Sequence, residues 1–289
     1  MDFYKILACP ECGTALKNEL DNLICISCGK KYLKRRKIPV LLPEGGISNQ
    51  YSMNYIDHYT TDAEVFDYFA VRACSATEQD ELRLRQRILS LIPKGTSLIL
   101  DAGSGGAWIA KELSPKGISV VSFDISVQNT ENAIKKIPNS YHFAVVGDGL
   151  APPFKLNTFD CIISSEVVEH IVEPAAFIQK LFSLIKPGGK LIISVPYKEM
   201  IQNSLCIHCN RLTPRNAHLH SLDENKMRNF YEGNDLKSFK YHIFGNKALT
   251  ILRFNVLVKF LPLSIWKILD KMANLIVNKP AHIIVEYIK

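Results

Sequence analysis

The sequence lacks the two kinds of apolar segment that carry a chain into or across a membrane. None of its uninterrupted apolar runs reaches the ~20 residues that a membrane-spanning helix needs. The first residues, MDFYKILACPECG, contain no long apolar core followed by a small-residue cleavage site, so we expect no signal peptide. These absences predict a cytoplasmic protein that folds in a reducing compartment, where disulfide bonds are rare.

The sequence also lacks a strong excess of charge of either sign. Its 35 lysines and arginines are opposed by 28 acidic residues, which leaves a formal net charge of +7. This modest excess permits an anionic partner but does not require one. With 289 residues and 47% hydrophobic content, the chain is long enough for one large core and a small accessory module.

Four of the eight cysteines stand near the front of the chain in two Cys-x-x-Cys pairs. The pairs are Cys9 with Cys12 and Cys25 with Cys28, and twelve residues separate them. Zn²⁺ prefers four such thiolates in a tetrahedron, and a site with four protein ligands has no open position for substrate. A module of about forty residues cannot fold on its apolar core alone, so metal binding would supply the missing free energy. We therefore predict a structural zinc ribbon over residues 1–43.

The segment from residue 5 to residue 43 resembles known zinc ribbons. It is similar to the small zinc-ribbon activators of tRNA and protein methyltransferases, and to the ribbon at the front of certain rRNA guanine methyltransferases. The basic run KKYLKRRK, residues 30–37, has two interpretations. It could form a phosphate-binding stripe in which Tyr32 stacks on a base, or a solvated edge of the ribbon, and the frequency of short basic runs favours the second.

Prolines and glycines between residues 39 and 46 mark the end of this module. Residues 44–92 are expected to form a linker and N-terminal helices. From Leu98 onward, short apolar runs alternate with helical periodicity, which predicts a doubly wound, mostly parallel α/β sheet over residues 93–289. The expected strands are SLILDAG, ISVVSFDI, YHFAVVGD, FDCIISSE and KLIISVPY, and HIIVEYIK is expected as an antiparallel strand at the end of the sheet.

Acidic residues and glycines follow the first three of these strands. The first strand runs into Asp101-x-Gly103-x-Gly105, the second ends at Asp124, and the third ends near Asp148. Ligands of doubly wound sheets bind at the carboxyl ends of the strands, so this pattern predicts a nucleoside site. A nicotinamide dinucleotide is disfavoured, because the third glycine of its motif is a tryptophan here.

Five consecutive motifs resemble those of class I S-adenosylmethionine-dependent methyltransferases, over residues 80–200. They are DAGSGGAW, FDIS, GDGLAPPF, FDCIISSEVVEHI and KPGGKLIISVP, in that order. The resemblance implies a seven-stranded Rossmann-like sheet that binds S-adenosylmethionine. The residues that it assigns to the cofactor site are Asp101, Gly103 and Gly105 for the methionine end, Asp124 and Ile125 for the ribose, and Asp148 and Gly149 for the adenine. Ala107 stands where the family often has a last glycine, and its small side chain is compatible with binding.

Glu166, Glu169 and His170 lie in SSEVVEHI, just after the fourth strand. These side chains would together hold a divalent ion such as Mg²⁺, which lowers the pKa of an acceptor hydroxyl. Alternatively, Glu169 and His170 cap and orient the next helix, and only His170 touches the substrate, as a general base; the sequence slightly favours this alternative. The motif resembles the O-methyltransferases of ubiquinone biosynthesis and the small-RNA 3′-terminal 2′-O-methyltransferases, whose metal ligands these three residues match. By that resemblance the acceptor carries two adjacent oxygens.

A second group of metal-binding residues follows the fifth strand, in an expected substrate insertion over residues 200–230. Cys206, Cys209, His218 and His220 form a Cys-x-x-Cys followed by a His-x-His, which allows a second zinc site. The competing hypothesis is that His218 or His220 completes the ion site at Glu166 or binds substrate.

Residues 247–279 form an apolar stretch that basic residues and a proline interrupt. The stretch contains six basic residues and a single acid, Asp270. It is expected to form a helical lid packed on the substrate pocket, and the alternative is a peripheral contact with a membrane interface.

These patterns together predict an S-adenosylmethionine-dependent methyltransferase with a zinc-ribbon prefix, acting on an oxygen of a small or lipid-like acceptor. An RNA methyltransferase that grips RNA through the ribbon is the first alternative. A binding module whose Rossmann core has lost turnover is the second. Fold alone does not identify the acceptor.

Overall fold

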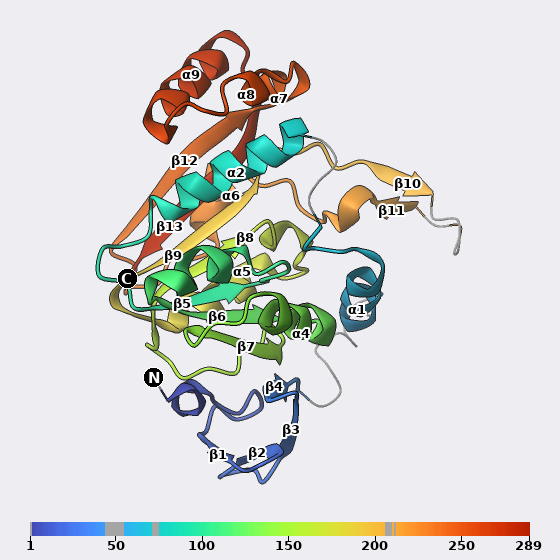
Figure 1. The fold of residues 1–289 in the computed structure, drawn as a ribbon, viewed down its shortest axis with the longest axis vertical. Coiled ribbons are helices and arrows are strands. Elements are labelled where there is room, and N and C mark those ends of the chain that lie inside the picture. The colour runs from blue at the N-terminus through green and yellow to red at the C-terminus, as the bar shows by residue number, and fades with distance from the viewer. Residues whose placement is uncertain (1, 44–54, 71–74, 206–209, 211) are drawn as a thin grey trace.

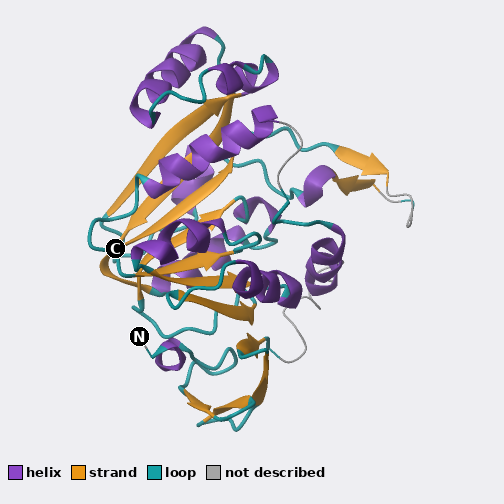
Figure 2. Ribbon diagram, in the orientation of Figure 1, coloured by secondary structure: helices purple, strands orange, loops and turns teal. Residues whose placement is uncertain are grey.

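The computed structural model describes residues 2–43, 55–70, 75–205, 210 and 212–289. Figure 1 shows three parts along the long axis of the molecule: a small β-rich ribbon at one end, a central sheet with its helices, and a helical cap at the other end. Figure 2 shows that the longest strands belong to the half of the sheet next to the cap.

The ribbon consists of one short 3₁₀ helix, η1, and four strands. These elements are η1 (Phe3–Ile6), β1 (Leu16–Asn18), β2 (Asn22–Cys25), β3 (Lys31–Arg35) and β4 (Ile38–Leu41). The four strands pair antiparallel in chain order. β4 also pairs in parallel with β7 (His142–Gly147), so Val40 lies opposite Val146. The ribbon therefore continues the central sheet through backbone hydrogen bonds.

Beyond β4, the central sheet has the strand order β7-β6-β5-β8-β9-β13-β12. The bounds of the other strands are β5 (Leu98–Ala102), β6 (Ser119–Asp124), β8 (Phe159–Ser165), β9 (Ile185–Pro196), β12 (Ser238–Asn246) and β13 (Pro280–Ile288). The five strands from β7 to β9 are parallel, whereas β13 and β12 are antiparallel to their neighbours. This order confirms the predicted doubly wound, mostly parallel, seven-stranded Rossmann-like sheet.

The last strand of the chain differs from the prediction in one respect. HIIVEYIK belongs to β13, which lies between β9 and β12 and not at the end of the sheet. Five consecutive residues of β13, from Ile283 to Tyr287, are buried, as an interior strand requires. The edge strand is β12, in which exposed polar residues interrupt the apolar ones, as is typical of edges. The same polar residues explain why apolar periodicity alone does not identify β12.

Helices cover both faces of the sheet. α2 (Ser75–Leu89), α3 (Trp108–Leu113) and α4 (Val127–Lys136) pack on one face, and α5 (Pro174–Ser183) and α6 (Glu224–Asn229) pack on the other. Neighbouring residues of β5 point to opposite faces, so Leu100 joins the core under α5 while Ile99 joins the core under α2 and α3. α1 (Tyr55–Val65) packs against α4. The short elements are η3 (Ser114–Lys116), η4 (Val168–His170), η5 (Arg215–Ala217), β10 (Asn203–Leu205) and β11 (Leu212–Pro214).

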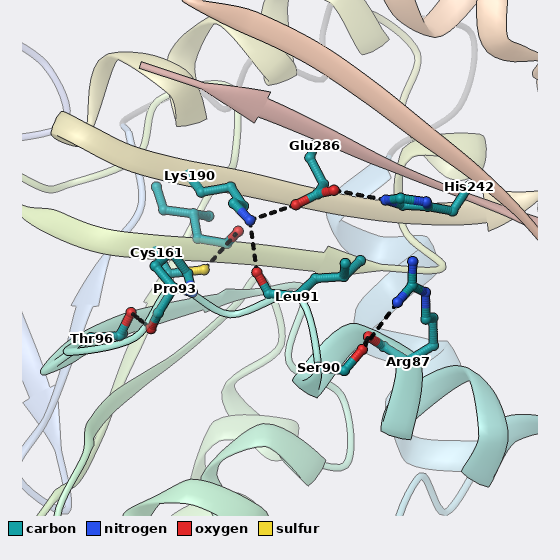
Figure 3. Close-up of polar contacts among 10 residues, drawn as sticks. Arg87, Ser90, Leu91, Pro93, Thr96, Cys161, Lys190, His242 and Glu286 are labelled. Carbon is teal, nitrogen blue, oxygen red and sulfur yellow. Dashed lines mark hydrogen bonds and ion pairs between the residues drawn. The ribbon is translucent and has the colours of Figure 1, made fainter. Parts of the chain in front are cut away.

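A polar clamp joins the three strands of the antiparallel half. Glu286, on β13, accepts a hydrogen bond from Lys190 on β9 and makes a 2.7 Å contact with His242 Nε2 on β12 (Figure 3). Lys190 also donates to the backbone carbonyl of Leu91 at 2.8 Å. Glu286 is 3% exposed, and although burial raises its pKa, the bonds from His242 and Lys190 lower it to about 2. The clamp therefore holds a buried carboxylate in its charged form.

The cap consists of α7 (Lys247–Ile251), α8 (Phe254–Leu257) and α9 (Leu263–Ile276). Arg83 on α2 donates hydrogen bonds to the backbone carbonyls of Val258 and Lys259, and Asn255 donates one to Ala76. These bonds fix the cap to α2 and leave its far side facing outward. Within the described ranges, no helix combines the length and the apolar character needed to cross a membrane.

Candidate functional site

The carboxyl ends of β5 and β6 bring three of the predicted cofactor residues into contact. β5 leads into a turn in which Gly103 and Gly105 adopt positive φ angles of 79° and 44°. Asp124, at the end of β6, accepts hydrogen bonds from the backbone N–H groups of Gly105 and Ser126, each at 2.9 Å. Burial raises the pKa of Asp124, although these N–H groups stabilise its carboxylate. The glycine turn and the acid thus form one hydrogen-bonded unit.

Asp101 and Ser104 are buried polar residues at this turn. Asp101 Oδ2 and Ser104 Oγ are buried and have no hydrogen-bond partner among the described residues. Burial raises the pKa of Asp101 well above its usual value, and the charge of Asp124 adds to the shift. Buried oxygens without a partner cost free energy, so the turn suits a ligand that donates hydrogen bonds.

Asp148 and Gly149 follow β7, the strand next to β6. Asp148 is 4% exposed, and its Oδ1 accepts a hydrogen bond from the backbone N–H of Leu150 at 2.8 Å. Burial raises the pKa of Asp148. A Cβ atom added to Gly149 would lie 2.3 Å from Cε2 of Phe177, so this ring packs directly on the backbone. Ile125 is half-buried and directly follows β6.

Tyr68 covers the glycine turn, which no sequence motif indicates. A Cβ atom added to Gly105 would lie 3.2 Å from the Tyr68 ring, and one added to Gly106 would lie 2.4 Å from the Tyr68 carbonyl oxygen. The Tyr68 hydroxyl donates a hydrogen bond to Asp62 on α1. The close approach of Tyr68 therefore requires a glycine at position 106, and the positive φ angle favours one at position 105.

Glu169, His170 and His218 form a cluster in which one ligand atom of each residue lies within 4.8 Å of the others. Glu169 and His170 lie on η4, whereas His218 directly follows η5. Glu169 is 1% exposed, and neither of its carboxylate oxygens has a hydrogen-bond partner in the described part of the chain. Nε2 of His170 lies 4.0 Å from Oε1 of Glu169. The sequence alone left the partner of this motif open, and the structure brings His218 to it.

Each histidine of the cluster is oriented through its Nδ1 atom. Nδ1 of His170 lies 3.2 Å from the carbonyl oxygen of Ala217, and Nδ1 of His218 contacts the carboxylate of Glu199. When Nδ1–H donates these bonds, Nε2 is the ring nitrogen that carries a lone pair. Burial and the neighbouring His218 lower the pKa of His170 to about 4, so this imidazole is neutral at pH 7.

The cysteines of the predicted second zinc site, Cys206 and Cys209, lie outside the described residues. Their proposed partner His220 makes a 2.8 Å contact between Nε2 and the carbonyl oxygen of Ile171. The second zinc site therefore stays a prediction.

Glu166 lies beside the cluster that contains Glu169, since its charge raises the pKa of Glu169, and it also contacts a histidine that the sequence motifs do not indicate. Nδ1 of His282, on β13, lies 3.5 Å from Oε1 of Glu166, and Nε2 of His282 lies 3.2 Å from Oδ2 of Asp80 on α2. Although burial lowers the pKa of His282, the two acids raise it to about 10. Glu166 itself adopts a positive φ angle of 56°, which is strained for a residue with a side chain. A lone histidine in a buried strand was the only sequence signal for this group.

The four ribbon cysteines converge as their spacing predicts. Their four sulfur atoms lie within 4.8 Å of one another. The sulfurs of Cys9 and Cys28 are 3.8 Å apart, and those of Cys12 and Cys25 are 3.4 Å apart. A tetrahedral zinc site with bonds of 2.3 Å separates its sulfurs by about 3.8 Å, so the cluster has the dimensions of such a site.

The basic run of the ribbon is partly occupied by contacts within the protein. Tyr32 is 6% exposed and its hydroxyl lies 3.2 Å from the sulfur of Cys9, so its ring is not available to stack on a base. Lys34 donates hydrogen bonds to Asn18 and to backbone carbonyls, and Arg36 forms an ion pair with Glu131. These contacts favour the interpretation of the run as an edge of the ribbon.

Comparisons with known proteins identify the family. Residues 76–239, more than half of the chain, match the model of a family described as "Methyltransferase domain". The ubiquinone biosynthesis O-methyltransferase of Parvibaculum lavamentivorans is 34% identical over 33% of this chain and 38% of the relative. The mitochondrial ubiquinone biosynthesis O-methyltransferase of Bos taurus is 34% identical over 38% of this chain and 31% of the relative. The chain thus covers less than half the length of either relative.

A solved structure supports the same fold. The S-adenosylmethionine-dependent methyltransferase of Mesorhizobium loti matches 73% of this chain and 100% of its own, with a TM-score of 0.50 and 14% identity. At that identity the likeness shows the fold alone. Because the family model matches more than half of the chain, we conclude that the chain belongs to the methyltransferase-domain family.

Proposed function

We propose that this protein is an S-adenosylmethionine-dependent methyltransferase that methylates an oxygen of a small or lipid-like acceptor. Its family membership and the names of its relatives support this proposal. The observation that carries it is the joining of two sites: the glycine turn and the motif that holds Glu169 and His170. They meet at Val167, whose Cγ2 lies 2.4 Å from a Cβ atom added to Gly103. A donor bound at the turn would therefore face the motif.

The residues at the strand ends fit S-adenosylmethionine in charge and in space. Asp101 Oδ2 and Ser104 Oγ, which have no partner in the described part of the protein, would accept hydrogen bonds from the amino group of its methionine end. The carboxylate of Asp124, at the end of β6, would accept a hydrogen bond from a ribose hydroxyl. Asp148 would accept a hydrogen bond from the amino group of the adenine. The ring of Phe177 packs on the backbone of Gly149, the next residue.

Transfer of a methyl group from a sulfonium is an in-line displacement, so the protein must align the acceptor oxygen and remove its proton. His170 would accept this proton, since its ring is neutral at pH 7 and its Nδ1 is tied to Ala217, although a pKa of about 4 makes it a weak base. This arrangement leaves Nε2 with the lone pair that a general base needs.

The same cluster also fits a divalent metal ion, and two observations favour that use. Glu169 is buried without a hydrogen-bond partner among the described residues, as is expected of a carboxylate that binds a metal ion. His218 donates Nδ1–H to Glu199, which is the usual orientation of a metal-bound histidine. One carboxylate and two imidazoles suit Mn²⁺ or Zn²⁺ better than Mg²⁺. A bound ion would supply Lewis-acid activation of an acceptor hydroxyl.

The ribbon is proposed to hold one structural zinc ion through Cys9, Cys12, Cys25 and Cys28. The sulfur separations support the assignment. Leu7, Leu23 and Leu41 of the ribbon share one apolar core with the central sheet. Because β4 pairs with β7, zinc would also support the strand that leads into Asp148. Its role is therefore to hold the edge of the sheet and not to take part in the reaction.

Two experiments test the proposed function in sequence. Calorimetry with S-adenosylmethionine and S-adenosylhomocysteine measures cofactor binding, and we expect both to bind. A protein that binds neither is a non-catalytic module and ends the proposal.

The second experiment identifies the acceptor. Purified protein is incubated with cell extract and a donor that carries an isotopically labelled methyl group, and mass spectrometry locates the label. We expect the label on an oxygen of a small or lipid-like molecule. Label in RNA would instead support the alternative in which the ribbon grips RNA.

A further inference from the structure

The outer face of the helical cap is unusually apolar. Eleven of the 25 large hydrophobic side chains that are exposed among the described residues lie within residues 251–277. On α9 the exposed ones are Ile265, Ile268, Met272, Leu275 and Ile276, which recur at helical spacing along one side. The opposite side of α9 buries Trp266 against Phe244 of β12. The helix therefore has two apolar faces, and only one of them packs on the protein.

Positive charge surrounds this outer face. The six basic residues of the cap segment are all exposed, and they are Lys247, Arg253, Lys259, Lys267, Lys271 and Lys279. The only acid of the segment, Asp270, is 4% exposed and accepts a hydrogen bond from the backbone N–H of Gly245. Lys267 and Lys271 also line an open groove with Ile268, Met272 and Leu275. An exposed apolar face on a segment whose exposed charges are all positive fits a surface that is apolar and anionic.

We propose that the outer face of the cap docks on the surface of a membrane that contains anionic lipids. Ile268, Met272 and Leu275 would enter the boundary between head groups and acyl chains, and the lysines beside them would contact lipid phosphates. A second copy of the chain is disfavoured as the occupant, because a two-fold contact would bring the six cations of one copy against those of the other. This inference goes beyond the proposed function, since docking requires no methyl transfer.

The docking face is connected to the candidate site through α2. Arg83 and Ala76 of α2 bind the cap, and Asp80 of the same helix contacts His282. His282 in turn lies 3.5 Å from Glu166. The membrane would thus be held at a fixed position relative to the site, as an enzyme with a lipid-like acceptor requires.

Flotation of the full-length protein with lipid vesicles tests the proposal. We expect binding to vesicles of phosphatidylcholine with phosphatidylglycerol, much weaker binding to phosphatidylcholine alone, and a loss of binding as salt is raised. The double variant Lys267→Gln/Lys271→Gln removes two cations near the surface, which should weaken binding about 10- to 30-fold. Ile268→Asp should weaken it by at least tenfold, because it places a charge in the apolar contact.

Matched controls are available on the ribbon, at the opposite end of the molecule in Figure 1. Lys31→Gln/Lys37→Gln makes the same change of charge at exposed positions, and Leu20→Asp makes the same kind of change at a side chain that is 92% exposed. Both controls should bind vesicles like the unaltered protein. Circular dichroism on every variant should show an unchanged fold, since each altered side chain is exposed.

Three results would overturn the proposal. The first is an unaltered protein that fails to float with anionic vesicles. The second is vesicle binding that the cap variants leave unchanged, or that the ribbon controls weaken as much. The third is a dimer in solution that Ile268→Asp dissociates, which would make the face a contact between copies of this chain. None of these readouts depends on S-adenosylmethionine, so failure of the proposed function would be seen separately.

Discussion

Replacing Glu169 by glutamine distinguishes the two mechanisms that the site allows. Glutamine has nearly the same size as glutamate but cannot carry the negative charge that a divalent ion needs. Glu169 is 1% exposed, and its oxygens have no hydrogen-bond partner among the residues that the structure describes. The substitution therefore breaks no hydrogen bond seen in the described part of the structure, and the metal-free variant should fold about as stably as the unaltered protein.

The effect of the metal can be worked out from linkage. An ion that binds only the folded state stabilises it by about 2.7 kcal/mol when its concentration is 100 times its Kd. For a protein of this size that gain corresponds to a rise in Tm of about 4–8 °C. We expect Mn²⁺ to produce this rise in the chelator-treated unaltered protein and not in Glu169→Gln. Turnover should be lost in the variant, while S-adenosylmethionine still binds at Asp101 and Asp124.

The assay combines thermal unfolding with and without Mn²⁺ or Mg²⁺ and a methyl-transfer measurement on protein dialysed against a chelator. Glu173→Gln is the matched control, because Glu173 is exposed only four residues away and forms no side-chain cap bond. The metal hypothesis is refuted if activity survives the chelator and Glu169→Gln is mild. In that event His170→Ala should cost about 10²- to 10⁴-fold in turnover, as the loss of a lone general base does.

Four further changes test other parts of the protein. Asp124→Ala should weaken S-adenosylmethionine binding about 10- to 150-fold in calorimetry with the fold intact, and an unchanged affinity would contradict the cofactor assignment. Cys9→Ser should lower the zinc content measured by metal analysis by one ion per chain and unfold the ribbon; chelator-free protein without any zinc would remove the proposed centre. His282→Ala should lower turnover about 10- to 100-fold without changing cofactor affinity, since it orients Glu166, and normal turnover would assign His282 to packing alone. The pKa of Glu286 falls from its usual 4.5 to about 2 on folding, so its contribution of up to about 3 kcal/mol is complete above pH 4.5 and is lost as the pH falls toward 2. Glu286→Gln should therefore show a flatter dependence of unfolding free energy on pH in this range, and identical curves would refute the clamp.

Local patterns explain how much of the fold the sequence predicts. Alternation of apolar runs and helical periodicity predicts a doubly wound sheet, because strands and helices each impose their own spacing on buried side chains. The same pattern misses β12, whose exposed polar residues weaken the apolar run, and puts the last strand at the wrong position. Strand order depends on contacts between segments that are distant in the chain, and no local pattern records it.

The residues of the candidate site likewise include some that the sequence predicts and some that it does not. The glycine turn, Asp124 and Asp148 are predictable because each directly follows a strand, and the carboxyl ends of parallel strands meet at one edge. The four ribbon cysteines are predictable because two short turns suffice to point them at one ion. In both cases a few neighbouring residues contain the whole signal.

Long-range packing determines which distant side chains join these groups. His218 lies 48 residues after His170, yet the fold of residues 212–220 brings it to Glu169 and against Glu199. Asp80 and His282 meet at Glu166 from α2 and β13, which are neighbours only after the sheet has formed. The helices, the strands and the chemistry at the ends of single strands are predictable from the sequence, because they depend on short-range periodicity and turn geometry. Which faces are covered, which stay exposed as on α9, and which side chains converge depend on long-range packing, and only the folded chain decides them.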